Sequence, residues 1–250
     1  MTVHFTVDVE SDCPPYLHTW RGIDEGMPRL LALLADERVP STFFVTGEVA
    51  DRHPEVVRAV VDGGHELACH GHTHRSFERM DADEARHEIA ESSRVLRGFA
   101  PVVSFRAPYL QFPAAFVPLL AEASYRLDSS QGRHKHRRAS VHTTAGVLRV
   151  PASITSSTLR WPALPRDALL ARLRDPIVLF AHPWEYVDLR RERLRFDCRF
   201  RTGDEALAST RSALRFFKRR GDRFALMRDC VAADDQTTGY QRKKSAASPA

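Results

Sequence analysis

The chain has 250 residues, of which 43% are hydrophobic and 28% charged, a composition that can bury one sizeable core and predicts a single catalytic-sized domain. The net charge of +5 is spread along the chain, and its dense basic spots at 133–138 and 242–244 have no interleaved aromatic residues, so we do not expect nucleic-acid binding. No stretch reaches the roughly 18 apolar residues of a membrane span, which excludes a transmembrane protein.

The first half of the chain alternates strand and helix patterns. Segment 53–64 shows the logic: Pro54 suits a first helical turn, apolar residues recur at helical spacing, and a glycine pair ends the pattern. In segment 81–98 the pattern predicts Asp81 as the helix cap, with Glu84 three residues later. In chain order we predict strands at 3–9, 41–47 and 65–70, and helices at 27–39, 53–64 and 81–98.

The second half repeats this rhythm. We predict strands at 102–108, 147–153, 176–183 and 223–227, and helices at 113–125, 165–175 and 204–221. Repeated strand–helix units with continuous apolar strands indicate a parallel sheet covered by helices, either open or closed into a barrel. Residues 234–250 lose periodicity and apolar content, so we predict a catalytic domain over 1–233 and a disordered basic tail over 234–250.

The four cysteines, Cys13, Cys69, Cys198 and Cys230, are scattered without paired spacing. This pattern argues against a disulfide framework and against a four-thiolate zinc site, and it favours reduced thiols. The N-terminal stretch MTVHFTVDVE lacks the basic and apolar segments of a secretory signal, so we expect a cytoplasmic protein.

Chemically suggestive residues follow four separate predicted strands, where functional groups of parallel α/β proteins collect. They are Asp8 and Glu10 in TVDVE, the histidines of CHGHTH at 69–74, Arg106 in FRAPY and His182 in FAHPWE. On a helical turn His70 and His74 would share one face and could share one cation, whereas an extended segment would leave pairings with His72 open. We therefore predict one joint site, whose third metal ligand comes from elsewhere in the chain.

Five motifs in this order resemble those of the NodB-type polysaccharide deacetylases, the family-4 carbohydrate esterases, over roughly residues 2–230. They are TVDVE, HGHTH, RAPY, YRLDSS and LFAHP. The resemblance implies an α/β fold in the form of a distorted (β/α) barrel, a divalent metal that is usually zinc, and hydrolysis of an N-acetyl or related amide.

The resemblance also implies a metal site. His70 and His74 fall on the two metal-binding histidines of the family, which makes His72 a neighbour that shapes the pocket. The family usually has two adjacent aspartates in its first motif, whereas here Val9 follows Asp8. The sequence is similar to a branch with an Asp-x-acid motif, so Glu10 is the expected third ligand and Asp12 the fallback.

Catalytic roles follow from the same resemblance. Asp8 is the expected general base, Arg106 keeps it ionised and oriented, and His182 protonates the departing amine. The backbone N–H of Tyr109 would meet the oxyanion. Asp128 either orients His182 or caps the turn that follows it.

Arg106 and Tyr109 are also expected to contact the substrate. Trp184, next to the catalytic histidine, either stacks on a sugar ring or closes the barrel end as a buried residue. Arg21 binds a substrate anion or pairs with Asp24.

The expected substrate is small and soluble, an N-acetylated amino sugar or glycosylated metabolite. The basic residues His134, Lys135, His136, Arg137 and Arg138 are available to meet an anionic group on it. The alternatives are hydrolysis of a cyclic imide, a ureide or an N-formyl group, and a binding module that has lost catalysis.

Overall fold

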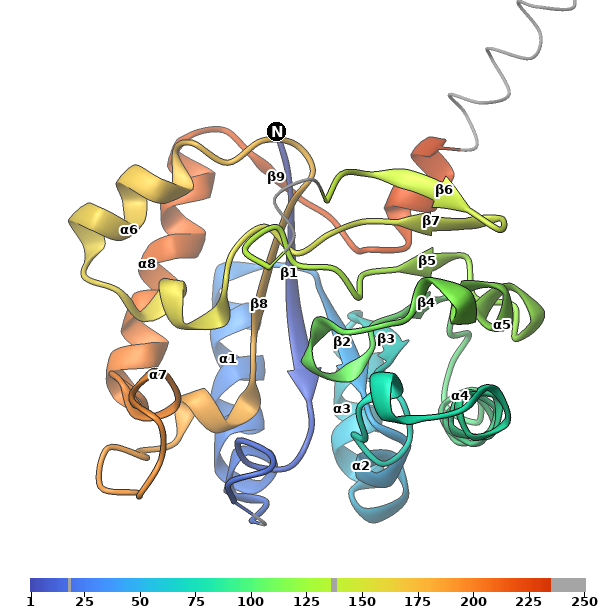
Figure 1. The fold of residues 1–250 in the computed structure, drawn as a ribbon. Helices are drawn as coiled ribbons and strands as arrows, with labels where there is room; N and C mark the ends of the chain where they lie inside the picture. Colours follow the sequence, from blue (N-terminus) through green and yellow to red (C-terminus); the bar gives the residue numbers. More distant parts are fainter. Residues whose placement is uncertain (18, 136–138, 235–250) are drawn as a thin grey trace, which may run out of the picture.

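The protein is described by a computed structural model that covers residues 1–17, 19–135 and 139–234. Its centre is one sheet in the order β6-β7-β5-β4-β3-β2-β1-β8, with β9 also paired to β1 (Figure 1). All pairs are parallel except β6 with β7. The strands are β1 (Thr2–Val9), β2 (Ser41–Val45), β3 (Glu66–Cys69), β4 (Ser104–Phe105), β5 (Leu127–Asp128), β6 (His142–Thr144), β7 (Val147–Arg149), β8 (Ile177–Ala181) and β9 (Arg223–Phe224).

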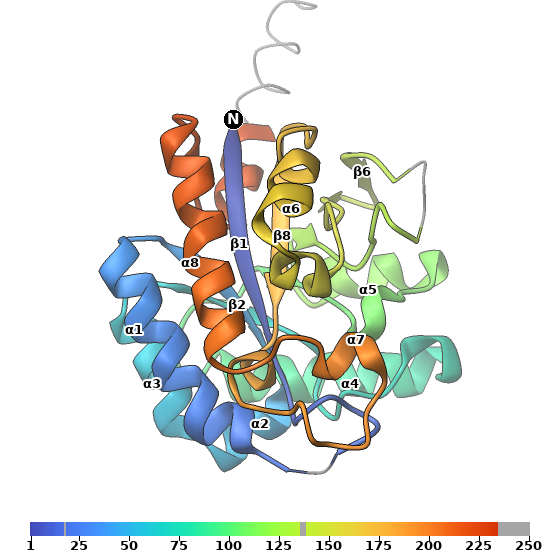
Figure 2. The ribbon, with the colours of Figure 1, turned by 90° about the vertical axis from the view of Figure 1, so that its left-hand side faces the viewer.

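Helices cover the outside of this sheet, with α1, α6 and α8 beside β1 and β8 and with α4 and α5 towards the other end (Figures 1 and 2). The helices are α1 (Met27–Glu37), α2 (Gly47–Arg52), α3 (Pro54–Asp62), α4 (Ala82–Leu96), α5 (Val117–Glu122), α6 (Ala163–Leu170), α7 (Phe196–Arg199) and α8 (Asp204–Arg219). The parallel sheet covered by helices confirms the α/β class expected from the sequence.

The sheet curls until its two ends meet. The segment after β7 reaches β8, where the Ser153 N–H donates to the Val178 carbonyl at 2.8 Å and the Val178 N–H donates to the Ser153 hydroxyl at 3.0 Å. Closure rests on this short contact and not on a full strand pair. The predicted distorted (β/α) barrel is thereby confirmed.

Strand β1 separates the two sides of the sheet through its period of two. Its apolar positions pack in the large core under the helices: Val3, Phe5, Val7 and Val9. Its polar positions are also buried and point to the opposite face, the inside of the barrel: His4, Thr6 and Asp8, with Glu10 continuing this row directly after the strand. The strand therefore builds the core with one face and lines the barrel interior with the other.

Several element boundaries differ from the sequence expectation. The predicted strand 41–47 ends at Val45, because the Thr46 side chain accepts a hydrogen bond from the Val49 N–H and starts α2. Helix α2 was not predicted, and neither were β5, β6 and α7. The predicted helix 113–125 is helical in the α sense only over Val117–Glu122. The predicted cap of α4 is confirmed: Asp81 and Glu84 form a reciprocal capping box.

The described chain ends at Asp234, so the predicted tail at 234–250 lies outside the described residues except for Asp234 itself. None of the helices in the described part of the chain is long and apolar enough to cross a membrane.

Candidate active site

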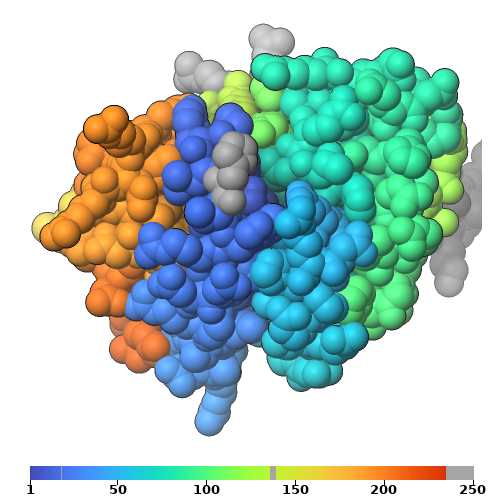
Figure 3. Space-filling view, turned by 90° about the horizontal axis from the view of Figure 1, so that it is seen from below, coloured from blue at the N-terminus to red at the C-terminus, as the bar shows by residue number. Residues whose placement is uncertain are grey.

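The inward-facing side chains of β1, β3 and β8 are followed, at the carboxyl ends of these strands, by polar residues that lie close together. On β8, Val178 and Phe180 belong to the apolar cluster inside the barrel, and His182 continues their row. On β3, Ala68 belongs to the same cluster and His70 follows it two residues later. With Glu10 at the end of β1, the alternation of strand side chains brings these groups together. Figure 3 views the molecule from this end.

Glu10, His70 and His74 form the one group of three potential ligands found in the described part of the chain, with all ligand atoms within 4.8 Å of one another. His70 Nε2 lies 3.4 Å from Glu10 Oε2, and His74 Nε2 contacts the same oxygen. The two histidines stand on a loop and not on a helix. That loop turns through left-handed residues at Gly71 (φ +77°) and His74 (φ +56°), which fold His74 back towards His70.

This group fits a divalent cation. The His70 Nδ1–H donates to the Arg106 carbonyl at 2.7 Å, which directs Nε2 towards Glu10 as the atom available to a metal. Burial alone would raise the pKa of Glu10, but His74 and His182 nearby hold that pKa well below its usual range. Two imidazoles and one ionised carboxylate are the ligand types of catalytic zinc sites.

The two neighbouring candidates are directed elsewhere. The His72 ring packs against Gly47 at the start of α2, where an added Cβ on that glycine would collide with it. Asp12 is buried and accepts hydrogen bonds from the Thr19 hydroxyl at 2.6 Å and from the Gly22 N–H at 2.8 Å. Asp12 therefore holds the loop after β1, and its carboxylate does not join the Glu10 group.

Asp8 and Arg106 form a buried ion pair below the Glu10 group. Arg106 Nη1 donates to Asp8 at 2.6 Å and to the Thr6 hydroxyl at 2.8 Å, and Nη2 donates to the Ser129 hydroxyl at 3.0 Å. The guanidinium also lies 4.1 Å from the centre of the Phe44 ring. Arg106 has no exposed surface, so the expectation that it contacts substrate is corrected: it positions Asp8.

His182 is oriented by Glu185. Its Nδ1 lies 2.8 Å from Glu185 Oε1, and the other Glu185 oxygen lies 2.8 Å from Nε of the buried Arg160. Burial lowers the pKa of His182, but the carboxylates of Glu10 and Glu185 outweigh burial and raise it to about 9. Glu185 is the residue that sequence reasoning missed as a partner, although its place three residues after His182 could have suggested it.

The expectation that Asp128 orients His182 was wrong. Asp128 accepts a hydrogen bond from the Ser130 N–H at 3.0 Å and pairs with Arg149 at 2.8 Å. The structure instead shows the alternative interpretation, in which Asp128 caps the turn after β5.

Trp184 is 5% exposed and stacks on the His182 ring with centroids 4.7 Å apart. Its indole N–H points at Glu10 Oε1, 3.3 Å away. Trp184 thus fixes two site residues, and the buried interpretation is favoured over stacking on a sugar.

A cavity of about 340 Å³ opens over these groups. Asp8, Glu10, His70, His74 and His182 lie on its floor, and the walls come from separate loops. These wall residues include Cys13, Pro15 and Tyr16, Tyr109 and Leu110, His134 and Lys135, and Arg195, Asp197 and Cys198.

Tyr109 stands at the edge of this cavity with a left-handed backbone (φ 60°) and a 37% exposed side chain. Its carbonyl accepts a hydrogen bond from the Lys135 ammonium. Lys135 and His134 are the members of the predicted basic segment that reach the cavity, and residues 136–138 lie outside the described residues. Arg21 pairs with Glu25 at 3.2 Å instead of the expected Asp24.

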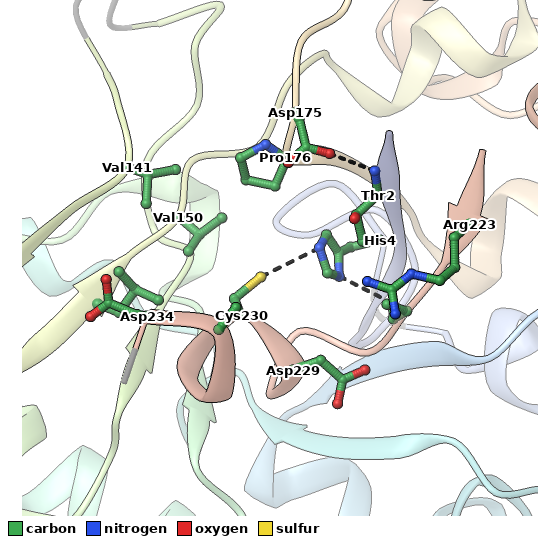
Figure 4. Close-up of a pocket in the computed structure, with 13 residues that line it drawn as sticks. Thr2, His4, Val141, Val150, Asp175, Pro176, Arg223, Asp229, Cys230 and Asp234 are labelled. Atoms are coloured by element: carbon green, nitrogen blue, oxygen red, sulfur yellow. Dashed lines mark hydrogen bonds between the residues drawn. The ribbon is translucent and has the colours of Figure 1, made fainter. Parts of the chain in front are cut away.

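A second cavity of about 270 Å³ lies at the opposite end of the barrel, around the start of β1 (Figure 4). His4 contacts the Cys230 sulfur at 3.3 Å and the Ala225 carbonyl at 3.1 Å there. Burial raises the pKa of the Cys230 thiol to about 12, which keeps it protonated and unreactive.

The family model for polysaccharide deacetylase matches residues 2–127, about half of the chain. The chain therefore belongs to the polysaccharide deacetylase family. The matched region contains Asp8, Glu10, His70, His74 and Arg106, whereas His182 lies beyond it.

Curated relatives match a shorter part of the chain. A chitooligosaccharide deacetylase of a Bradyrhizobium strain is 39% identical over 85 residues, which is 33% of this chain and 39% of the relative. A peptidoglycan-N-acetylglucosamine deacetylase of Bacillus cereus is 32% identical over 88 residues, 34% of this chain and 32% of the relative. The matches thus span about a third of the length of these relatives.

Comparison with solved structures shows similarity over most of the chain. A family 4 carbohydrate esterase of Streptomyces lividans, solved with acetate, superposes with a TM-score of 0.62 at 18% identity and covers 90% of this chain and 92% of its own. This likeness places the described barrel among the folds of family 4 carbohydrate esterases.

Proposed function

We propose that this protein is a metal-dependent hydrolase that removes the N-acetyl group from an amino sugar or glycosylated metabolite. The observation that carries the proposal is the arrangement of Glu10, His70 and His74 on the floor of one cavity, with Asp8 and His182 beside them. Such a set combines a cation site with groups for both proton transfers of amide hydrolysis.

Glu10, His70 and His74 would hold the divalent cation, and zinc suits two imidazoles and one carboxylate best. When bound, the cation supplies Lewis acidity, which makes water more acidic and polarises the amide oxygen. The Trp184 N–H and the Arg106 carbonyl keep Glu10 and His70 in fixed orientations, so the ligand set is preorganised.

Asp8 would accept the proton of the attacking water. Its pairing with Arg106 uses one carboxylate oxygen, Oδ1, and leaves the other for water. Because Arg106 also donates to Thr6 and Ser129, the guanidinium is held from several sides and transmits little motion to Asp8.

His182 would give a proton to the departing amine. The carboxylate of Glu185 holds the Nδ1 proton, so Nε2 is the atom that points towards Glu10 and the cavity. A histidine whose pKa is raised is protonated near neutral pH, as a general acid must be. The N–H of Tyr109 would stabilise the oxyanion from the cavity edge, and the Tyr109 side chain would contact the substrate.

The choice of an N-acetylated sugar is supported by the names of the relatives, which are deacetylases of chitooligosaccharides and of N-acetylglucosamine in peptidoglycan. Lys135 and Arg195 at the cavity wall would meet an anionic substituent on the substrate. A planar cyclic imide would need a tight apolar slot, whereas this cavity carries histidines, carboxylates and two tyrosines.

The test is release of acetate from N-acetylated amino sugars and short oligosaccharides by zinc-loaded protein, by chelated protein and by chelated protein reloaded with zinc. We expect acetate and a free amine in equal amounts, lost on chelation and restored on reloading. The Asp8→Asn variant should bind zinc and release no acetate. Activity that survives both chelation and Asp8→Asn would refute the proposed mechanism.

A further inference from the structure

Two cysteines that are far apart in the sequence meet at the wall of the candidate active site. Cys13 lies in the loop after β1 and Cys198 lies in α7, and both line the cavity over Glu10 and His74. They pack in one apolar cluster with Trp184, Val187 and Leu189. The structure has both as free thiols.

Each thiol is the largest influence on the pKa of the other: Cys198 raises the pKa of Cys13, and Cys13 lowers the pKa of Cys198. Cys13 is buried, whereas Cys198 is partly exposed. Cys198 is therefore the thiol that an oxidant from solution reaches first, and Cys13 is placed to react with it next.

The cysteines join two wall segments that are anchored separately. The loop that carries Cys13 is held by Asp12, which accepts from the Gly22 N–H. The segment over residues 188–203 is closed by a 3.0 Å hydrogen bond from the Leu189 N–H to the Thr202 hydroxyl. Figure 2 shows α7 beside the N-terminal loop, and Figure 3 shows the two segments adjoining on the cavity face.

The Cys198 segment is also connected to the candidate general acid. Arg160 Nη2 donates to the Asp197 carbonyl at 2.6 Å, and Arg160 Nε lies 2.8 Å from Glu185, the residue that orients His182. Arg160 is 1% exposed, so this link is rigid. A change in the position of Cys198 would therefore reach His182 through three successive contacts.

Neither cysteine belongs to the Glu10 group, the one set of three potential ligands in residues 1–17, 19–135 and 139–234. Two adjacent thiols, one reachable and one buried, are instead suited to thiol–disulfide exchange.

We propose that Cys13 and Cys198 form a reversible disulfide across the cavity wall when the protein meets a low-molecular-weight disulfide. The Cys198 thiolate attacks one sulfur of the reagent, forms a mixed disulfide and releases the first reagent thiol. The Cys13 sulfur then attacks the Cys198 sulfur, forms the intramolecular disulfide and releases the second reagent thiol. The protein loses two electrons and two protons, which the two released thiols carry.

The experiment uses the full zinc-loaded chain and oxidised glutathione as the probe. After equilibration, the protein is alkylated under denaturing conditions and analysed by mass spectrometry before and after reduction. We expect the free thiols to fall from four to two, a mass loss of about 2 Da for two hydrogen atoms, and one linked peptide pair containing Cys13 and Cys198. The Cys198→Ser variant should show no linkage, and Cys230→Ser, which changes a thiol outside this cavity, should keep it.

A second measurement reports on local opening of the wall segment that carries Cys198. Trypsin cleavage at the arginines of residues 190–201 should slow by about tenfold or more on oxidation, because the disulfide restrains local opening of that segment. The Cys13→Ser variant should show no such change. Four alkylated thiols after oxidation, or glutathione retained on Cys198 without linkage to Cys13, would overturn the proposal. Neither readout depends on hydrolysis, so failure here is distinguishable from failure of the proposed function.

Discussion

The imidazole of His182 is held by Glu185, whose carboxylate lies 2.8 Å from Nδ1 on the turn directly after β8. Because Arg160 holds the second oxygen of Glu185, the orientation of the histidine depends on a buried chain of three residues. This relationship leads to the first prediction.

Replacing Glu185 with Gln should lower the pKa of His182, because one of the three carboxylates that raise it is removed. A general acid must be protonated, so activity is lost as pH rises through this pKa, and in the variant the loss should begin at lower pH. We expect a shift of about one pH unit in the basic limb of kcat/KM, the size of one charge-assisted hydrogen bond. Asp128→Asn is the matched control, since Asp128 does not contact His182, and an equal shift there would contradict the assignment.

Metal content should separate the ligands from their neighbours. Glu10→Ala, His70→Ala and His74→Ala should each lose bound zinc in elemental analysis after dialysis, because each removes one of the three grouped donors. His72→Ala should retain zinc, since its ring packs against Gly47. If His72→Ala lost zinc as completely as His74→Ala, then His70 and His74 would not be the correct pair of histidine ligands.

Arg106→Gln should destabilise the protein by about 3–5 kcal/mol, because it leaves Asp8 as an unpaired buried charge. The free energy of unfolding from urea titration gives this value. Arg106→Lys keeps the positive charge but loses the guanidinium hydrogen bonds to Thr6 and Ser129. The decrease in unfolding free energy should therefore be smaller for Arg106→Lys than for Arg106→Gln. Equal losses in the two variants would mean that the charge on Arg106 is unimportant.

Chelation should lower the thermal midpoint, and added zinc should raise it in proportion to the logarithm of free metal, because the cation binds the folded state. The shift should disappear in His74→Ala, which lacks a donor. A zinc-dependent shift of the same size in His74→Ala would point to a site elsewhere in the chain.

The cap of α4 offers a prediction away from the site. Asp81 accepts hydrogen bonds from the N–H groups of Asp83 and Glu84, so Asp81→Ala should cost about 1 kcal/mol of unfolding free energy. Metal content should be unchanged. A change in bound zinc would mean that α4 is coupled to the site through Glu88, which accepts from the His72 N–H.

The sequence alone determined the alternation of strands and helices, the cap of α4 and the set of strands whose ends carry reactive groups. These features are local: residue propensity, capping and a period of two act within a few neighbouring residues. The motif order also identified Asp8, Glu10, His70, His74 and His182 as one group. The structure brings all five to one cavity, and their individual roles stay predictions.

Tertiary structure decided the contacts between these groups and the rest of the chain. Whether Asp128 meets His182 depends on how far β5 and β8 are separated as the sheet curls, and no local pattern encodes that distance. The burial of Arg106 and the proximity of Cys13 to Cys198 depend on the same curvature of the sheet. This curvature brings loops that are separated by most of the chain to the same end of the barrel. Sequence periodicity sets the face of a strand on which a side chain lies, and the packing of the whole sheet sets its neighbours there.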